Sequence, residues 1–316
     1  MNDDSRSGRL GGGGRSITLL AGVLVLVLAC GALLWPGSGP SRSRGVFLVF
    51  DSTGDRVRVV NVYEPLLQFL NGFTGRPLAL EVVATVDAFT EKQTAGVDFV
   101  LCPDGLGLDL PADEFVPVAV GRRAAPRNLR PRGVLVYRKS AGLVTDPWIS
   151  RPGATVCGDS VSLTATGSWR RQGKPSTAVL PDLNTCAWGP DPYDHSPVLH
   201  AVRLGGFDYA LVRQWDADRF FADGLLSSLD WGLELMTIPV PDVVVFASRS
   251  VNGKTRLAVG DGLASLGRRA EDDSPAAGKA RKAVGGLNLV GFNLLFDPDF
   301  DLVRRNFAGD WPPARD

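Results

Sequence analysis

Five hydroxyl side chains lie close together in the stretch CGDSVSLTATGSW, which runs from Cys157 to Trp169, and they could bind an anion. They are Ser160, Ser162, Thr164, Thr166 and Ser168. The apolar run ATVCG at the start of this region predicts a strand. A helix that begins near Thr164 would present free backbone N–H groups and the positive end of its dipole. Thr164, Ala165 and Thr166 would then form a cradle for an oxyanion.

Two structural explanations of the same hydroxyl groups stay open. Serine and threonine are favoured N-caps, and a cap stabilises a helix by about 1 kcal/mol, although it needs only one hydroxyl. A solvated loop would also account for a run of small polar residues.

Residue types that carry metal or nucleophile chemistry are scarce. The only histidines are His195 and His200, and the four cysteines include no C-x-x-C pair. This composition does not provide the usual zinc spacing, and it gives little basis for a cysteine–histidine nucleophile. We therefore expect no metal site, no cofactor and no enzymatic activity.

Overall composition narrows the classes of partner. The 316 residues suffice for about two domains. Lys+Arg and Asp+Glu each number 34, so the net charge is zero. Because nucleic-acid binding favours a basic surface, we expect no nucleic-acid partner.

An uncharged apolar segment, ITLLAGVLVLVLACGALLW, spans Ile17 to Trp35. As a helix it would be about 28 Å long, close to the hydrocarbon thickness of a bilayer. Arg6, Arg9 and Arg15 precede it, so residues 1–16 should be cytoplasmic and the rest of the chain extracytoplasmic. The alternative is a lipoprotein signal, because VLAC before and at Cys30 resembles a bacterial lipobox. Both interpretations attach the protein to the cell membrane, through a linker at residues 36–45.

Strand and helix patterns alternate after the linker. We expect strands at 46–50, 77–84 and 97–103, with helices at 57–75 and 86–96 between them, and Pro65 near a first helical turn. This order predicts a parallel sheet covered on both faces.

The second half of the chain repeats the alternation less regularly. Strands are expected at 115–121, 132–139, 154–158 and 207–212, and two more between 233 and 250. Helices are expected at 196–206, 255–269 and 298–309, with Val198, Leu199, Val202 and Leu204 facing inward on the first. Residues 271–282 are expected to be a loop or a frayed helix.

Several of these segments resemble the phosphate/phosphite/phosphonate-binding family of ABC transporters. The resemblance covers Val46 to Phe307 and includes YEPLLQFLNGFTGRPLALEV, AGVDFVLCPDG and RGVLVYRKSAGL. It also includes HSPVLHAVRLGGFDYALV and IPVPDVVVFASR, and TATG stands where the family has S-T-S-G. The order and spacing of the pieces carry the resemblance, since each one alone is weak.

The resemblance implies an α/β, bilobal type II periplasmic-binding-protein fold with two mainly parallel sheets and a ligand cleft between the lobes. Lobe 1 would comprise residues 46–132 and 241–316, and lobe 2 residues 133–240. A hinge would lie near Gly133–Val136 and Ile238–Asp242, and the partners would be a small oxyanion and an ABC permease. Cys157 and Cys186 fall in the same lobe, which suggests a disulfide between them, although disulfide pairing stays open.

The resemblance also points to individual ligand-binding residues. His195 and Asp242 stand where the family has a ligand-contacting histidine and carboxylate, although Asp242 would also suit an ordinary turn after proline. The family commonly presents tyrosines where this chain has Asp87 and Cys102. Asp87 would either cap a helix or face the cleft, and Asp87 or Asp104 in the cleft would repel a phosphate dianion. We expect an extracytoplasmic solute-binding protein, or else an accessory or sensor domain with an altered pocket.

Overall fold

Two separate β-sheets organise the computed structural model, which describes residues 44–93, 96–123, 131–141, 156–159, 161–165, 167, 191–268 and 274–307. The larger sheet defines lobe 1 and has the order β10-β4-β9-β3-β1-β2. Its strands are β1 (Gly45–Phe50), β2 (Leu78–Val83), β3 (Phe99–Pro103), β4 (Phe115–Arg122), β9 (Val243–Ser248) and β10 (Gly291–Leu294). The smaller sheet defines lobe 2, with the order β6-β7-β5-β8. Its strands are β5 (Gly133–Arg138), β6 (Val156–Gly158), β7 (Tyr209–Arg213) and β8 (Trp231–Leu235).

The expectation of mainly parallel sheets is wrong. In lobe 1, β1 pairs in parallel with β2 and β3, but β9 runs antiparallel to β3 and β4, and β10 antiparallel to β4. In lobe 2 only the β6–β7 pair is parallel, among the strands that the structure describes. The reason is the path of the chain, because β9 re-enters lobe 1 from lobe 2 and runs between β3 and β4 in the opposite direction.

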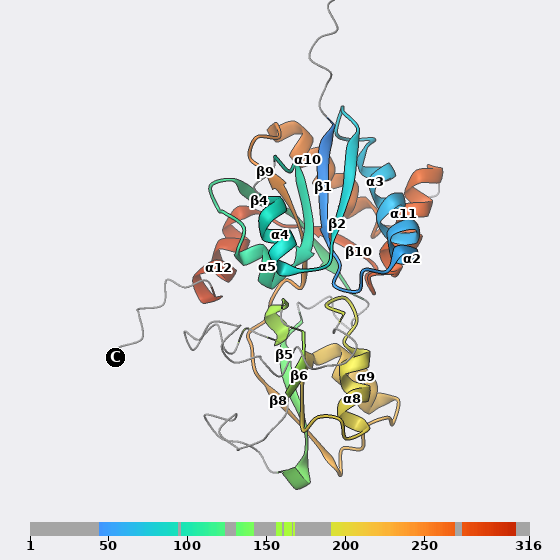
Figure 1. The fold of residues 1–316 in the computed structure, drawn as a ribbon, viewed down its shortest axis with the longest axis vertical. Coiled ribbons are helices and arrows are strands. Elements are labelled where there is room, and N and C mark those ends of the chain that lie inside the picture. The colour runs from blue at the N-terminus through green and yellow to red at the C-terminus, as the bar shows by residue number, and fades with distance from the viewer. Residues whose placement is uncertain are drawn as a thin grey trace, which may run out of the picture. The chain divides into compact units, whose positions relative to one another are not determined.

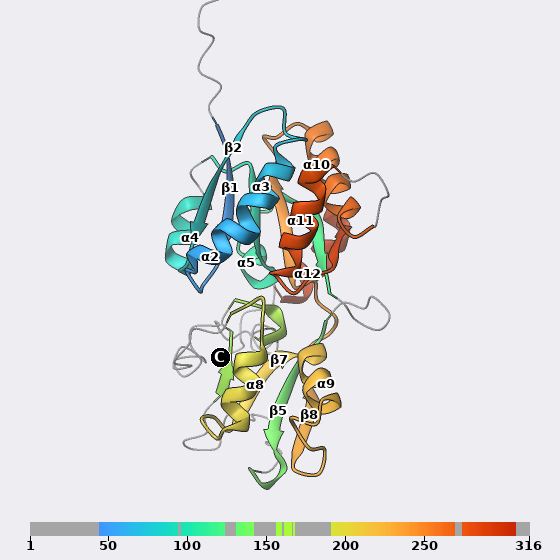
Figure 2. The ribbon, with the colours of Figure 1, turned by 90° about the vertical axis from the view of Figure 1, so that its right-hand side faces the viewer.

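Helices cover both faces of the lobe 1 sheet (Figures 1 and 2). Phe47 and Val49 of β1 pack against one group of helices, while Leu48 and Phe50 pack against the other group. The first group comprises α2 (Arg56–Arg58), η1 (Val59–Tyr63), α3 (Glu64–Leu70), α10 (Gly253–Ser265) and α11 (Pro275–Gly285). The second comprises α4 (Val86–Gln93), α5 (Asp104–Leu108) and α12 (Asp297–Phe307). This alternation explains why β1 reads as a continuous apolar run.

The long helix expected at 57–75 forms as the continuous series α2, η1 and α3. Its middle part, η1, is a π-helix, in which the N–H of Glu64 donates to Val59 five residues earlier. Pro65 lies in the first turn of α3 as expected, where a missing N–H costs least.

Two details of the helix expectations are wrong. Residues 275–285 form the regular helix α11 rather than a frayed segment, because the Ser274 side chain caps it by accepting from Ala277 N. Leu204 lies just past the end of α8 (Ser196–Arg203) and is 76% exposed, whereas Val198, Leu199 and Val202 are buried. The sequence patterns also did not predict α5, α9 (Gln214–Ala222), β10 or the short helix η2 (Lys139–Ala141).

The chain crosses between the lobes twice, after β4 and after β8. The two crossing segments lie side by side, since Val240 N donates to Pro131 O at 2.9 Å and Met236 N donates to Gly133 O at 2.8 Å. The predicted membrane segment 17–35, its linker and Cys30 lie outside the described residues. Within the described ranges, no helix is both long enough and apolar enough to span a bilayer.

Candidate functional site

Five ionisable side chains with almost no exposed surface meet where the two lobes contact each other. We call them the charged cluster: Asp104, Asp159, His195, Arg213 and Asp242. Asp104 and Asp242 belong to lobe 1 segments, and the other three belong to lobe 2. Since unpaired buried charges are very unfavourable, the partners of each group decide what the site can do.

Asp242 is the centre of the cluster. One carboxylate oxygen accepts from Arg213 Nε at 2.7 Å and the other from Arg123 Nε at 2.5 Å. Burial alone would raise the pKa of Asp242, but the charges of Arg123 and Arg213 outweigh burial and hold this pKa below its usual range. The backbone φ of Asp242 is 107°, a conformation that L-residues rarely adopt and that the surrounding contacts must maintain. Both oxygen atoms of this carboxylate therefore already accept hydrogen bonds from guanidinium groups of the protein.

The hydroxyl-rich stretch turns helical at Leu163–Ala165, as expected, but an aspartate holds the turn before it. Asp159 Oδ1 accepts from Val161 N at 3.0 Å and from Ser162 N at 2.6 Å. The Thr164 hydroxyl is fully buried and has no hydrogen-bond partner within the described residues. The hydroxyl of Thr164 is thus not used for capping, and Thr166 lies outside the described residues.

Asp104 of lobe 1 faces this helical turn directly. Its Oδ1 accepts from Leu163 N at 2.9 Å, and its Oδ2 accepts from Asp242 N at 3.2 Å. Burial and the neighbouring charge of Asp242 raise the pKa of Asp104 well above its ordinary value. The carboxyl group of Asp104 therefore accepts a hydrogen bond from the N–H group of Leu163, at the place where the sequence predicted a bound oxyanion.

The contact around Asp104 leaves no free space between the lobes at that point. A Cβ atom placed on Gly105 would lie 2.0 Å from the carbonyl oxygen of Val161. Only glycine permits so close an approach of α5 to the 159–165 loop.

His195 lies inside lobe 2, and both of its ring nitrogens face protein groups. Its Nδ1 accepts from Arg213 N at 3.0 Å, and its Nε2 is 2.7 Å from Asp159 Oδ2, although neither of these two atoms makes a hydrogen bond within the described residues. Burial by itself would raise the pKa of Asp159, but the adjacent His195 and the charge of Arg213 lower it. His195 thus connects the end of β7 to the 159–165 loop.

A second set of contacts joins the segment 191–195 to lobe 1. The Tyr193 ring is fully buried in the lobe 1 core, and its hydroxyl donates to Phe50 O at 2.6 Å. Arg58 Nη2 donates to Asp191 at 2.5 Å, and Arg123 Nη1 donates to Tyr193 O at 3.1 Å. These contacts join the 191–195 segment of lobe 2 to lobe 1.

The remaining predicted residues lie away from the charged cluster or within the core. Asp87 is exposed on the first turn of α4, whose backbone is capped by Thr85 Oγ1 rather than by Asp87. Cys102 is a free, fully buried thiol among apolar side chains of β3, and burial raises its pKa. Cys157 forms a disulfide whose partner lies outside the described residues, so pairing with Cys186 stays a prediction.

Sequence reasoning missed Arg123, Asp159, Tyr193 and Arg213, and it mentioned Asp104 only as a source of repulsion. A signal was present for four of these five residues, because Asp104, Arg123, Asp159 and Arg213 each stand at the carboxyl end of a strand, where open α/β sheets bind ligands. No group of residues in the described ranges has the composition of a metal site.

Comparison with known proteins finds relatives by structure alone. No protein-family model matches the chain, and no characterised sequence matches it. A Xanthomonas citri protein bound to ATP has a TM-score of 0.58 and 15% identity, over 84% of this chain and 97% of that one. A binding protein component of an ABC phosphonate transporter from Pseudomonas aeruginosa has a TM-score of 0.52 and 13% identity, over 83% and 85%.

A further structural relative, from Prochlorococcus marinus, was solved in complex with methylphosphonate. Its TM-score is 0.52 and its identity is 12%, over 83% of this chain and 97% of that one. At such low identity, the likeness establishes the fold rather than the ligand. The chain has a mixed α/β, bilobal fold like that of periplasmic binding proteins.

Proposed function

We propose that this chain is an extracytoplasmic solute-binding protein of an ABC transporter, anchored by residues 17–35. It binds a small oxyanion, such as phosphate or a phosphonate, at the 159–165 loop between the lobes and delivers it to a permease. The contact that carries the proposal is the 2.9 Å hydrogen bond from Leu163 N to a carboxyl oxygen of Asp104, beside the Thr164 hydroxyl, which has no partner among the described residues. An N–H group that binds one oxyanion can bind another of similar size.

In this proposal an incoming ligand displaces Asp104 from Leu163 N. The raised pKa of Asp104, which results from burial and from Asp242, favours its neutral acid form. A neutral carboxylic acid can donate a hydrogen bond to a ligand oxygen instead of repelling it. A carboxyl oxygen of Asp104 thus accepts from Leu163 N until a ligand displaces it, and the neutral acid can then donate to the ligand.

The ligands of two structural relatives support a phosphorus oxyanion. Methylphosphonate and ATP differ in size, but both present oxygen atoms bound to phosphorus. The same chemistry suits a helical turn with a free hydroxyl and backbone N–H groups.

Isothermal titration calorimetry with phosphate, phosphite, methylphosphonate and the cationic osmolyte glycine betaine tests the proposal. We expect one of the three oxyanions to bind and glycine betaine not to bind. Thr164→Val should weaken the binding about 10- to 100-fold, the effect of losing one hydrogen bond to a charged group. Thr90→Val, the same change on the exposed face of α4, is the matched control. Absence of binding by all three oxyanions, or full affinity in Thr164→Val, would contradict the proposal.

A second candidate function is an accessory or sensor domain whose lobes stay together without solute. The specific observation in its favour is the insertion of Tyr193 into the lobe 1 core. Small-angle X-ray scattering separates the two candidates. A solute-binding protein should have a larger radius of gyration without ligand than with it, whereas a permanently joined domain should have the same radius in both states.

A further inference from the structure

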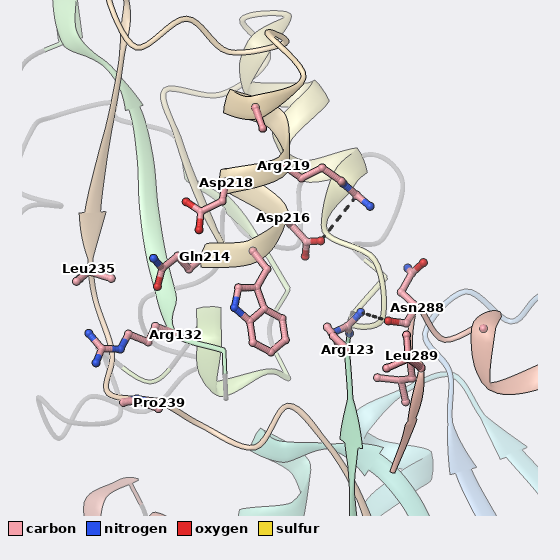
Figure 3. A pocket seen from close by; sticks show the side chains of 14 residues that line it. Arg123, Arg132, Gln214, Asp216, Asp218, Arg219, Leu235, Pro239, Asn288 and Leu289 are labelled. Atoms are coloured by element: carbon pink, nitrogen blue, oxygen red, sulfur yellow. Dashed lines mark hydrogen bonds and ion pairs between the residues drawn. The ribbon is translucent and has the colours of Figure 1, made fainter. Parts of the chain in front are cut away.

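A cavity of about 890 Å³ lies beside the two segments that cross between the lobes. Figure 3 shows it lined by the first turns of α9, by the crossing segments at Arg132 and Pro239, and by the residues before β10. We call it the hinge-side cavity. Its volume is within the usual range for small-molecule sites, and both lobes contribute to its walls.

Arg123 separates the hinge-side cavity from the charged cluster. Its Nε donates to Asp242 on the cluster side, and its Nη1 donates to two backbone carbonyls. Its Nη2 is buried and has no partner among the residues that the structure describes, and only 6% of the residue is exposed. A buried guanidinium N–H without an acceptor is unfavourable, so Arg123 adds an unsatisfied positive group to this wall of the cavity.

The hydrogen-bond donors of the cavity outnumber its free acceptors, because both of its aspartates already have partners. Asp216 is already paired with Arg213 and Arg219, and Asp218 accepts a hydrogen bond from Gln214. The backbone carbonyl of Arg132 accepts from Gln214 N at 2.8 Å, but its exposed side chain makes no hydrogen bond or ion pair with the described part of the chain. Figure 3 shows Arg132 and Arg123 on opposite sides of the cavity. The helix α9 also begins here without a side-chain cap, which adds the positive end of its dipole.

The rest of the wall is apolar and partly flat. It is formed by Trp215, Ala222, Leu235, Pro239, Leu289 and Val290. An indole presents a large planar surface that stacks well on another ring, so a planar apolar body would fit this wall better than a compact inorganic ion.

We propose that the hinge-side cavity binds a small organic anion with a planar apolar body, of which an aromatic carboxylate is the simplest kind. The carboxylate accepts hydrogen bonds from the exposed guanidinium group of Arg132, the positive charge of Arg123 adds to the field of the cavity, and the ring packs on Trp215. This site is separate from the oxyanion site at the 159–165 loop, because the hydrogen bond between Arg123 and Asp242 lies between the two sites.

Titration calorimetry with 2-naphthoate on the whole extracytoplasmic chain tests this second site, with neutral 2-naphthamide as the matched control ligand. We expect saturable binding of 2-naphthoate and binding of 2-naphthamide that is at least about tenfold weaker. Arg132→Gln should weaken 2-naphthoate binding about tenfold or more, and this exposed position allows the change without unfolding. Trp215→Ala should weaken both ligands, because it removes the stacking surface.

Thr164→Val, at the other site, should leave 2-naphthoate affinity unchanged. This separates the two proposals, since phosphonate binding can fail while 2-naphthoate binding succeeds, and the reverse also holds. Equal affinity for 2-naphthoate and 2-naphthamide, unchanged affinity in Arg132→Gln, or no saturable binding up to the solubility limit would each overturn the inference.

Discussion

The charged cluster and the hinge-side cavity lie on opposite sides of Arg123, and they satisfy their polar groups in different ways. In the charged cluster, Asp242, Arg213 and His195 bind one another, and Asp104 occupies the N–H group of Leu163. In the hinge-side cavity, the side chain of Arg132 and one nitrogen of Arg123 have no partner within the described residues, and space for a ligand remains. Internal pairing stabilises the first region, whereas open donors make the second one available for binding.

The difference shows that charged residues at a lobe interface do not by themselves identify a ligand site. A buried carboxylate with two guanidinium partners has little remaining capacity for a ligand, however suitable its position. The free groups that surround a cavity are the better indication, even when they are less buried.

The largest expected effect comes from breaking the centre of the charged cluster. Asp242→Ala leaves Arg123 and Arg213 buried without their carboxylate, which should cost about 3–5 kcal/mol of unfolding free energy. Urea denaturation followed by circular dichroism measures this loss. Asp242→Asn keeps the shape and the tolerance of positive φ, so it should lose less than Asp242→Ala. A loss below about 1 kcal/mol in Asp242→Ala would mean that the cluster does not join the lobes.

Two glycines offer a matched test of how closely the lobes approach. Gly105→Ala places a methyl group against the Val161 carbonyl and should destabilise the protein by about 1–3 kcal/mol. Gly278→Ala, in the exposed part of α11 where nothing lies within 4 Å, should instead stabilise it by about 0.5–1 kcal/mol. Thermal unfolding of both variants measures the two signs. The same sign in both would show that α5 does not press on the 159–165 loop.

The pH dependence of stability tests the charge state of Asp104. Because burial and Asp242 raise its folded pKa above the unfolded value, its contribution favours folding at low pH and is lost as pH rises through the folded pKa. The Asp104→Asn variant has no titrating group at this position and should not lose stability in this way. The unfolding free energy of the variant minus that of wild type should therefore increase from about pH 4 to about pH 8. Each unit of raised pKa corresponds to about 1.4 kcal/mol.

The opposite dependence belongs to Asp159 and Asp242. Their lowered pKa values stabilise the fold above about pH 4, and this stabilisation is lost only as pH falls through the folded pKa. It therefore does not obscure the Asp104 effect between about pH 4 and pH 8. A difference between wild type and Asp104→Asn that is constant with pH would contradict the raised pKa.

The smallest expected effect comes from a substitution in the hinge-side cavity. Arg132→Gln should change the unfolding free energy by no more than about 0.5 kcal/mol, because the side chain is exposed and has no partner in the described part of the chain. Chemical denaturation, run in parallel with Asp242→Ala, measures it. A large loss would show that the hinge-side cavity is a structural contact rather than an open one.

Much of the fold could be predicted because the relevant signals are local. The alternation of Phe47, Leu48, Val49 and Phe50 between two cores follows from the period of a strand, and the buried face of α8 follows from helical spacing. Strand directions could not be predicted in this way. Periodicity identifies β9 as a strand, but the return of the chain from lobe 2 makes it antiparallel to β3.

The candidate site was predicted only in part for the same reason. The helical turn at Leu163–Ala165 and its buried threonine follow from the local pattern of hydroxyl residues after a strand. Arg123 and Arg213 have no such pattern around them, and a lone arginine at a strand end is usually exposed. Their importance appears only where they meet the carboxylate of Asp242.

The sequence by itself determined the order of most strands and helices, the polar loops at the strand ends and the scarcity of metal-binding residues. Tertiary structure alone decided which polar groups pair. The Asp104–Leu163 contact joins residues 59 positions apart, and the Arg123–Asp242 contact joins residues 119 positions apart. Sequence periodicity carries information over a few residues, whereas such pairing depends on how two crossings of the chain bring the lobes together. That pairing places the carboxyl group of Asp104 on the N–H group at which an incoming anion is proposed to bind.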